Sequence, residues 1–380
     1  MFVKVVVIGA GIVGASCAYH LAERGAEVTV LERANQPATG ATGKSAAGLR
    51  HQFTHPQNVK MSSHSAAAYR NFERNLGVSA GFKEVGYLFL LSAEMLPRWQ
   101  QQAEMQRDLG AAVETLDLGA TQAKYPYLNL EGLAGSSFGP QDGVLDPHSV
   151  TLGYLAAAKH LGAKVSLSTE VLGLARERGL WHIQTSQGKV QGDAVVNAAG
   201  AFAGQLGRLA SLDVPVKPYR RNVYVSAPLP DFPHPTPLMI DMTTGVYVRS
   251  EGMRFLIGLS NEDELPGDNQ AVDWVWLEHT LELALPRFPF LERVGLDQKA
   301  CWAGLYAITP DHLPILGEMI EGDGFYNACG FSGHGVQHAP ATGLILSEEI
   351  LDGQAHSFDI TDFRAERFER TGLSKESNIV

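Results

Sequence analysis

The order of apolar and polar positions in the first 32 residues predicts a strand, a helix and a second strand. Residues 3–8 form a short β-branched run, which is typical of a buried strand in a parallel sheet. Apolar residues in the following stretch are spaced for one packed face of a helix. Gly25 ends that helix, and residues 27–31 predict a second strand that runs into Glu32.

The turn between the first strand and the helix reads GAGIVG over residues 9–14 and indicates a dinucleotide-binding unit. In such a unit Gly9 permits a tight turn, Gly11 lets the backbone approach a pyrophosphate, and Gly14 lets the helix pack on the sheet. The helix N-terminus supplies free N–H groups to the phosphates. Glu32 is placed to bind a ribose diol and disfavours a 2′-phosphate, so these residues predict FAD or NAD.

The rest of the chain predicts an α/β protein (α+β overall) with two kinds of sheet. Residues 37–48 form a loop of small residues that lets a flat ligand lie close to the backbone. The region 215–299 is rich in proline and aromatic residues and predicts antiparallel strands, at 222–226, 245–249 and 254–259, beside a substrate pocket. A second Gly-rich turn, at 330–336, precedes an apolar helix expected at 341–351, and a helix N-terminus there would stabilise a reduced flavin. Further helices are expected at 58–76, 95–109 and 147–161, and further strands at 86–91, 164–168, 171–175, 181–185 and 194–200.

Composition narrows the class of protein. A chain of 380 residues can divide into two domains, and its net charge of −11 disfavours a nucleic-acid or anionic-membrane partner. The three cysteines lack metal-ligand spacing, and their odd number argues against a disulfide framework, so no metal is expected. No apolar run reaches the length of a membrane span, and we expect a cytoplasmic protein.

Four segments together resemble the D-amino acid oxidase superfamily of FAD enzymes, and within it the branch of sarcosine oxidase and the dye-linked L-proline dehydrogenase β-subunit. These segments are 7–14 with Glu32, 41–50, 197–200, and 302–311 with 330–335. The resemblance implies a Rossmann-like FAD-binding domain assembled from 1–80, 143–214 and 300–380. A mainly antiparallel substrate domain would then comprise 81–142 and 215–299.

The resemblance also implies roles for individual residues. Arg50 matches the arginine that holds a substrate carboxylate, and Tyr306 matches a tyrosine of the amine pocket. Tyr247 shares a strand face with Arg249 and is expected at the same cavity. His334 could accept a proton or serve only to shape the turn, and Gln337 replaces the lysine that assists the carboxylate arginine. The expected cofactor-binding residues are Gly9, Gly11, Ile12, Val13, Gly14, Glu32, Arg33, Thr42, Ser45, Ala46, Ala47, Gly48, Leu49, Val171, Ala199, Gly200, Gly304, Gly333, His334, Gly335, Val336 and Gln337.

Departures from the family pattern also carry predictions. Gly304 and Ser45 stand where relatives attach flavin covalently, so we expect FAD to be held without a covalent link. Leu256 falls at or next to a lysine that sarcosine oxidases place over the flavin, and Arg254 is the only cation close to it in the sequence. A dehydrogenase is therefore expected rather than an oxidase, with a quinone, a dye or a partner protein as electron acceptor.

The implied reaction moves a hydride from the carbon beside an amine to flavin N5 and leaves an imine. The expected substrates are sarcosine, proline or a D-amino acid. Two alternatives stay open: a 2-hydroxy acid or glycerol 3-phosphate dehydrogenase, and a non-catalytic FAD-binding subunit or assembly factor of a larger complex.

Overall fold

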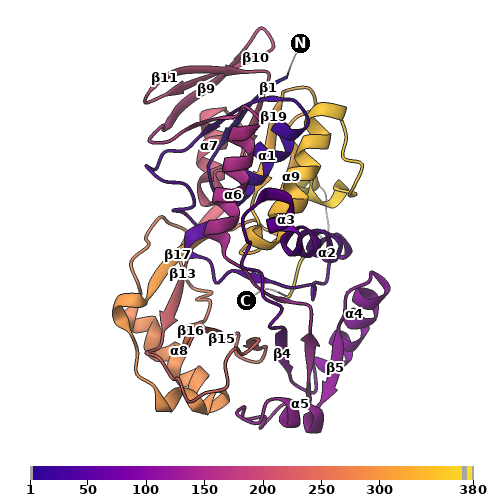
Figure 1. Cartoon of the computed structure of the whole chain (residues 1–380), viewed down its shortest axis with the longest axis vertical. Coiled ribbons are helices and arrows are strands. Elements are labelled where there is room, and N and C mark those ends of the chain that lie inside the picture. Colours follow the sequence, from indigo (N-terminus) through magenta and orange to yellow (C-terminus); the bar gives the residue numbers. More distant parts are fainter. Residues whose placement is uncertain (1–2, 370–374, 379–380) are drawn as a thin grey trace.

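The computed structural model describes residues 3–369 and 375–378 and has two halves, each built on one sheet (Figure 1). The half at the top of Figure 1 contains a six-stranded sheet in which neighbouring strands are parallel, except for the antiparallel edge strand β18. In spatial order its strands are β18 (Ile315–Glu318), β19 (Phe325–Cys329), β12 (Ala194–Asn197), β1 (Lys4–Ile8), β2 (Glu27–Leu31) and β8 (Lys164–Ser166). The predicted strand–helix–strand unit at the N-terminus is confirmed.

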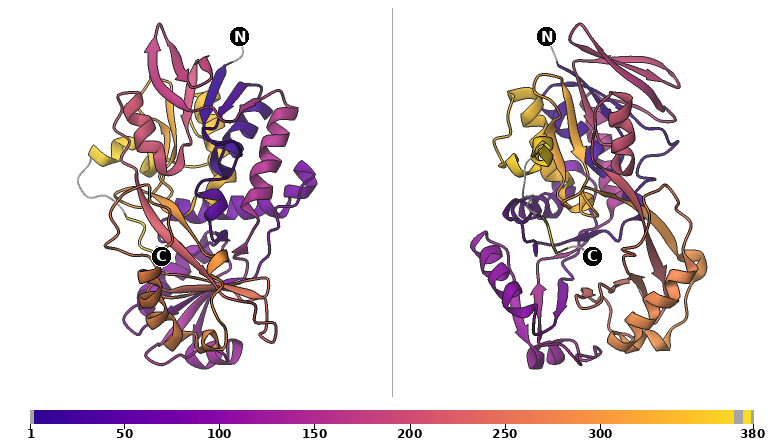
Figure 2. Two further views of the ribbon diagram at one scale, coloured as in Figure 1. Left: turned by 90° about the vertical axis from the view of Figure 1, so that its left-hand side faces the viewer. Right: turned by 180° about the vertical axis from the view of Figure 1, so that it is seen from behind.

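Helix α1 (Ile12–Glu23) packs against α9 (Gly335–Asp352) and α6 (Pro147–His160) (Figures 1 and 2). The start of α6 follows from its sequence. The Asp146 side chain accepts hydrogen bonds from the N–H groups of His148 and Ser149, and Pro147 occupies the first turn. The helices α2 (Pro56–Arg70), α3 (Phe72–Leu76) and α7 (Ala203–Leu209) complete this half.

The other half holds an eight-stranded sheet that is antiparallel except where β14 pairs with β4. Its strands in spatial order are β17 (Trp302–Ile308), β13 (Lys217–Val225), β16 (Arg254–Gly258), β15 (Tyr247–Glu251), β14 (Leu238–Asp241), β4 (Tyr87–Leu91), β6 (Gly135–Gly139) and β5 (Glu114–Asp117). Helices in this half are α4 (Leu96–Asp108), α5 (Leu118–Lys124) and α8 (Trp274–Arg287), and Phe255, Phe288 and Phe290 lie in its core. The mainly antiparallel sheet predicted for this region is confirmed, whereas α8 was not foreseen.

Smaller elements join these parts. A separate antiparallel sheet contains β11 (Gly188–Gly192), β10 (Leu180–Thr185) and β9 (Val171–Glu177), and β3 (Gly48–Leu49) pairs with β7 (Gly143–Val144). Strand β17, which the expected division grouped with the FAD-binding segments, is hydrogen-bonded to β13 of the eight-stranded sheet. In Figure 1 these two strands extend from the lower half to the upper half.

Two expected helix boundaries were wrong. The stretch 58–76 forms two helices, α2 and α3, separated at Asn71. The last long helix begins at Gly335, not at 341, although Pro340 lies inside it. Pro340 has no N–H to donate to the Val336 carbonyl, and the Tyr69 hydroxyl donates to that carbonyl instead, so the helix continues through the proline.

Candidate functional site

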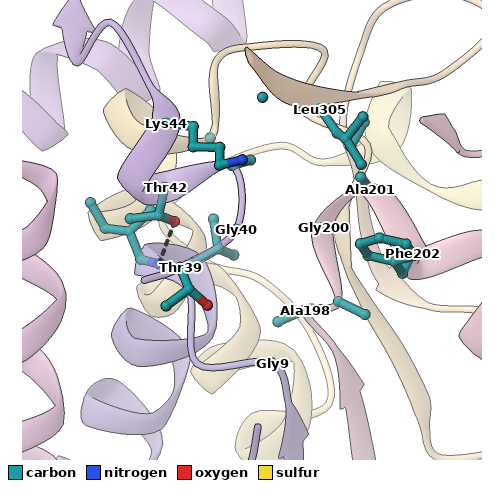
Figure 3. Close-up of a pocket in the computed structure, with 18 of the residues that line it drawn as sticks. Gly9, Thr39, Gly40, Thr42, Lys44, Ala198, Gly200, Ala201, Phe202 and Leu305 are labelled. Atoms are coloured by element: carbon teal, nitrogen blue, oxygen red, sulfur yellow. Dashed lines mark hydrogen bonds between the residues drawn. The ribbon is translucent and has the colours of Figure 1, made fainter. Parts of the chain in front are cut away.

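A cavity of about 700 Å³ is lined by residues from both halves of the molecule. Its wall begins at the Gly-rich turn of residues 9–13, passes the loop 38–46 and reaches β13, β15 and β17. In Figure 3, Thr39, Thr42 and Lys44 lie on one side of the opening, and Ala201, Phe202 and Leu305 lie on the other. A cavity of this size is typical of a small-molecule or cofactor site. The described residues contain no His, Cys, Asp or Glu cluster suited to a metal ion.

The Gly-rich turn has the backbone geometry expected at a pyrophosphate. Gly9 has a φ of +113°, and a Cβ there would collide with the Ala198 carbonyl. A Cβ on Gly14 would collide with the Gly9 carbonyl, so this glycine permits close packing of α1 on β1. Thr42 fixes the loop on the turn, since its hydroxyl oxygen accepts a hydrogen bond of 3.1 Å from the Ile12 N–H (Figure 3).

Glu32 and Arg33 form the far end of the cavity. The Glu32 carboxylate accepts hydrogen bonds from the N–H groups of Ala10 (2.8 Å) and Ala34 (2.9 Å), which fix the side chain at the cavity wall. Arg33 stacks on Phe202, with its Cζ atom 3.8 Å from the ring centroid. An acceptor that can bind a ribose diol thus lies next to a helix N-terminus that can bind phosphate, and this arrangement fits the adenosine diphosphate part of FAD.

Tyr247 and Tyr306, which the sequence analysis assigned to the amine pocket, both line the opposite end of the cavity. A Cβ on Gly333 would collide with the Tyr306 ring, so this glycine lets the ring lie against the turn before α9. Burial raises the pKa of both tyrosine hydroxyls, and both therefore stay protonated at neutral pH. Arg221 of β13 also lines this end, with its Cζ atom 5.4 Å from the Tyr306 ring centroid.

Arg50 lies behind the cavity wall, not in it. It is 4% exposed, and its guanidinium donates to the main-chain carbonyls of Gln52 and Asn378. Its Nη2 atom is also 3.2 Å from Nε2 of His334, and its backbone N–H donates to Oε1 of Gln337 at 2.8 Å. The structure therefore brings the buried Arg50 and Gln337 and the half-buried His334 together as a layer behind the cavity wall that Tyr247 and Tyr306 line.

His334 is neutral in this layer. Its burial and the nearby charge of Arg50 hold the pKa of the imidazole well below its ordinary value. Because a guanidinium only donates, we assign Nε2 of His334 as the acceptor of the Arg50 contact. The nitrogen that would accept a substrate proton is therefore already occupied, and the expected role as proton acceptor is not supported by this contact.

Most expected cofactor residues line the cavity. Those on its wall are Gly9, Gly11, Ile12, Val13, Glu32, Arg33, Thr42, Ser45, Ala46, Val171, Ala199, Gly200, Gly304, Gly333, Gly335 and Val336. Those that the structure places elsewhere are Gly14, Ala47, Gly48, Leu49, His334 and Gln337.

Arg221 and Lys44 are the wall residues of most chemical interest that the sequence reasoning missed. The expected strand began at residue 222, whereas β13 begins at Lys217. Extending the strand would have placed Arg221 on the same face as Val223, which also lines the cavity. No pattern singled out Lys44, whose Nζ donates to Oε1 of Gln270 at 2.8 Å.

Three side chains that the sequence analysis considered near the substrate or the flavin do not line the cavity. Arg249, which alternates with Tyr247 on β15, forms an ion pair with Glu251 at 2.6 Å. Leu256 is buried against Val223 and Val225, and neither Leu256 nor Arg254 lines the cavity. Arg221, which the sequence analysis did not consider, supplies a cation on the wall itself.

Comparisons with known proteins agree with this geometry. The sequence model of the DAO family, described as FAD dependent oxidoreductase, matches residues 4–349. The crystal structure of L-proline dehydrogenase from P. horikoshii superposes with a TM-score of 0.90 at 30% identity, over 98% of this chain and 99% of that chain. Glycine oxidase from Geobacillus kaustophilus gives a TM-score of 0.83 at 26% identity, over 95% of this chain and 98% of that chain.

Curated sequences give similar levels of identity. FAD-dependent oxidoreductase domain-containing protein 1 of Xenopus laevis is 31% identical over 99% of this chain and 84% of its own length. Mitochondrial sarcosine dehydrogenase of Mus musculus is 28% identical over 98% of this chain, which spans only 42% of that protein.

Proposed function

Because the chain belongs to the DAO family of FAD-dependent oxidoreductases, we propose that it oxidises a small amino acid or secondary amine. The expected substrates are of the sarcosine, proline or D-amino acid type. One observation carries the proposal: a single cavity joins a dinucleotide-binding turn to a pocket containing Tyr247, Tyr306 and Arg221. The names of the similar proteins, which include proline dehydrogenase, sarcosine dehydrogenase and glycine oxidase, support an amine substrate.

We assign FAD to the cavity wall formed by residues 9–13, Glu32, the loop 38–46 and residues 199–200. When bound, FAD supplies the two-electron chemistry by accepting a hydride from the carbon beside the substrate nitrogen, and water hydrolyses the resulting imine. The N-terminus of α9 is directed at the cavity through Gly335 and Val336, where its dipole favours negative charge.

The residues of this chain mainly bind and orient the substrate. Tyr247 and Tyr306 are protonated phenols that can donate hydrogen bonds or pack on an apolar ring, because burial keeps the pKa of each above its ordinary value. Arg50, His334 and Gln337 hold the backbone and the turn behind them, so we treat these as positioning residues. Correct orientation of the reacting C–H bond contributes a large part of the rate in such reactions.

Three further features of the sequence reading remain proposals. We propose an FAD-binding domain comprising 1–80, 143–214 and 300–380 and a substrate domain comprising 81–142 and 215–299, with β17 shared between them.

We propose a quinone, a dye or a partner protein as electron acceptor, and this fits the dehydrogenases among the similar proteins. We propose a cytoplasmic location, which the three free cysteines support because thiols stay reduced there. No helix among the described residues meets the length and apolarity that a membrane crossing requires.

An anaerobic reduction assay tests the function. Purified holoprotein should lose its yellow colour when mixed under argon with one or more of sarcosine, L-proline, glycine or D-alanine. Bleaching by lactate or glycerol 3-phosphate alone would contradict the proposal and favour an alcohol dehydrogenase. A protein that retains FAD but is reduced by no substrate would instead favour a non-catalytic subunit.

A further inference from the structure

We propose that Arg221, rather than Arg50, binds the carboxylate of the amino-acid substrate. This inference rests on the proposed amine oxidation. It also makes the protein selective for amino acids over simple amines, since a planar guanidinium binds a carboxylate through two parallel hydrogen bonds.

Arg221 projects into the cavity from the middle of β13. The register places it opposite Gly304 of β17, which has no side chain to compete for the space. Arg221 and Val223, two positions apart on the strand, both line the cavity. Tyr306 and Tyr247 lie on the same part of the wall, so the cation is beside the pocket proposed for the amine.

The guanidinium of Arg221 is poorly satisfied by the protein. Nη1 donates to the Arg220 carbonyl at 2.9 Å, and the buried Nε has no hydrogen-bond partner. No carboxylate of the described residues lies within 4.0 Å of it. Burial lowers the pKa of the group, and the charge of Glu264, which pairs with Arg220, offsets this only in part.

The neighbouring arginines on the same sheet each have an acidic partner, unlike Arg221. Arg249 on β15 pairs with Glu251 at 2.6 Å, and Arg254 on β16 pairs with Asp297 at 2.5 Å. Arg220, the residue before Arg221, pairs with Glu264 at 3.1 Å and with Asp273 at 2.9 Å. Of the four, only the arginine at the cavity lacks an acidic partner within the described part of the chain. A buried charge without a partner is costly, so an anionic ligand is the natural complement.

The other two cations of the wall, Arg33 and Lys44, also have no ion-pair partner among the described residues, but each is held by a different protein group. Arg33 stacks on Phe202 beside Glu32, at the nucleotide end. Lys44 donates to the Gln270 side chain. A pyrophosphate is expected at the N-terminus of α1, at the far end of the cavity from Tyr247, so it does not account for Arg221. A substrate carboxylate is the anion that belongs beside the two tyrosines.

Arg50 has fewer free hydrogen-bond donors for a substrate carboxylate than Arg221 has. Its donors reach the main-chain carbonyls of Gln52 and Asn378, and its Nη2 is 3.2 Å from His334. Phe53 covers one face of the guanidinium, with the ring centroid 3.9 Å from Cζ. A substrate would therefore have to displace the tail residue Asn378 to reach Arg50.

Equilibrium binding separates the two arginines without relying on turnover. The probes are acetate and 2-furoate, carboxylates that carry no oxidisable amine, and the signal is the shift of the flavin absorption spectrum of the holoprotein. Arg221→Gln should raise both dissociation constants by about tenfold or more, since hydrogen bonds to a charged group are lost. Arg221→Lys should restore part of this loss. Arg254→Gln removes the same charge from the neighbouring strand outside the cavity and should leave both constants unchanged.

Other outcomes of these measurements would overturn the assignment of Arg221. Unchanged binding in a folded, FAD-loaded Arg221→Gln protein, or a larger loss in Arg50→Gln than in Arg221→Gln, would overturn the inference. Loss of FAD in both Arg221 variants would assign the residue to the cofactor and also overturn it. If the wild-type enzyme is bleached by amines while Arg221→Gln binds normally, this inference alone fails. If no amine bleaches the wild type, the proposed function fails, and the inference fails with it.

Discussion

The main-chain carbonyl of Asn378 accepts a hydrogen bond from the guanidinium of Arg50, 328 positions earlier in the chain. Glu376 holds this tail in place. Its carboxylate accepts hydrogen bonds from the N–H and hydroxyl of Thr54, at 3.0 and 2.6 Å, from the N–H of His55, and from the amide of Asn58. Both Glu376 and Asn378 are buried, so the tail forms part of the layer behind the cavity.

Glu376→Ala should release this tail. The substitution leaves several buried donors without an acceptor, which costs about 1–3 kcal/mol for each unsatisfied group. We expect a lower melting temperature and faster trypsin cleavage after the exposed Lys375. Ser377→Ala is the matched control, because it removes only the hydroxyl that accepts from Arg98 near the surface. Equal cleavage rates in the two variants would show that Glu376 does not anchor the tail.

Stability should fall as the pH drops from 7 to 5 because His338, which is buried, and His334, which is half-buried, resist protonation. Burial lowers the pKa of His338 to about 3 and holds the pKa of His334 well below its ordinary value. In the unfolded chain both groups take up a proton near pH 6.5, while the native protein does not. Below that pH each such histidine reduces the free energy of unfolding by about 1.4 kcal/mol per pH unit.

Urea denaturation at pH 7.5, 6.0 and 5.0 measures this effect. His338→Gln can keep a polar group near Ser62, whose hydroxyl is 3.2 Å from Nε2 of His338, but it has no proton to gain. Its stability should depend less on pH than that of the wild type. A free energy of unfolding that is the same at pH 7.5 and 5.0 in the wild type would contradict the assignment.

The nucleotide end was predictable because its signals are local. Gly9, Gly14 and Glu32 lie within one strand–helix–strand unit, where spacing along the chain fixes their positions in space. The substrate end depends on contacts between distant segments. The β13–β17 register, which brings Arg221 opposite Gly304, and the return of Asn378 to Arg50 leave no periodic signal in the sequence. The family resemblance placed Arg50 near the site, but only the three-dimensional structure reveals that its donors are already engaged.

FAD should be released intact by denaturation. Gly304 and Ser45 line the cavity but offer no thiol or imidazole for a covalent link. Cys301 does not line it, and its sulfur accepts a hydrogen bond from the Val225 N–H. After acid precipitation the yellow colour should therefore be in the supernatant. Colour retained in a washed pellet would indicate a covalent link, and a Cys301→Ser variant would then test that residue.

Reduced enzyme should pass electrons to an artificial dye faster than to oxygen. A positive charge next to the reacting oxygen stabilises developing superoxide, and such preorganised charge is worth several kcal/mol in a site closed to water. The strand position where relatives place a lysine is Leu256, which is buried between apolar side chains. Arg254 is also unsuitable, since it is directed to Asp297 and lies outside the cavity.

Among the described residues, Arg221 is the cation that lines the substrate end, and we expect a bound carboxylate to neutralise it. Stopped-flow reoxidation of substrate-reduced enzyme, in air-saturated buffer and with a dye such as dichlorophenolindophenol, measures both rates. The oxygen reaction should be slower by about tenfold or more, which corresponds to roughly 1.4 kcal/mol of missing stabilisation. Equal rates would contradict the prediction. Arg221→Gln would then show whether the charge serves oxygen, because in that case the variant would slow reoxidation by air and leave the dye reaction unchanged.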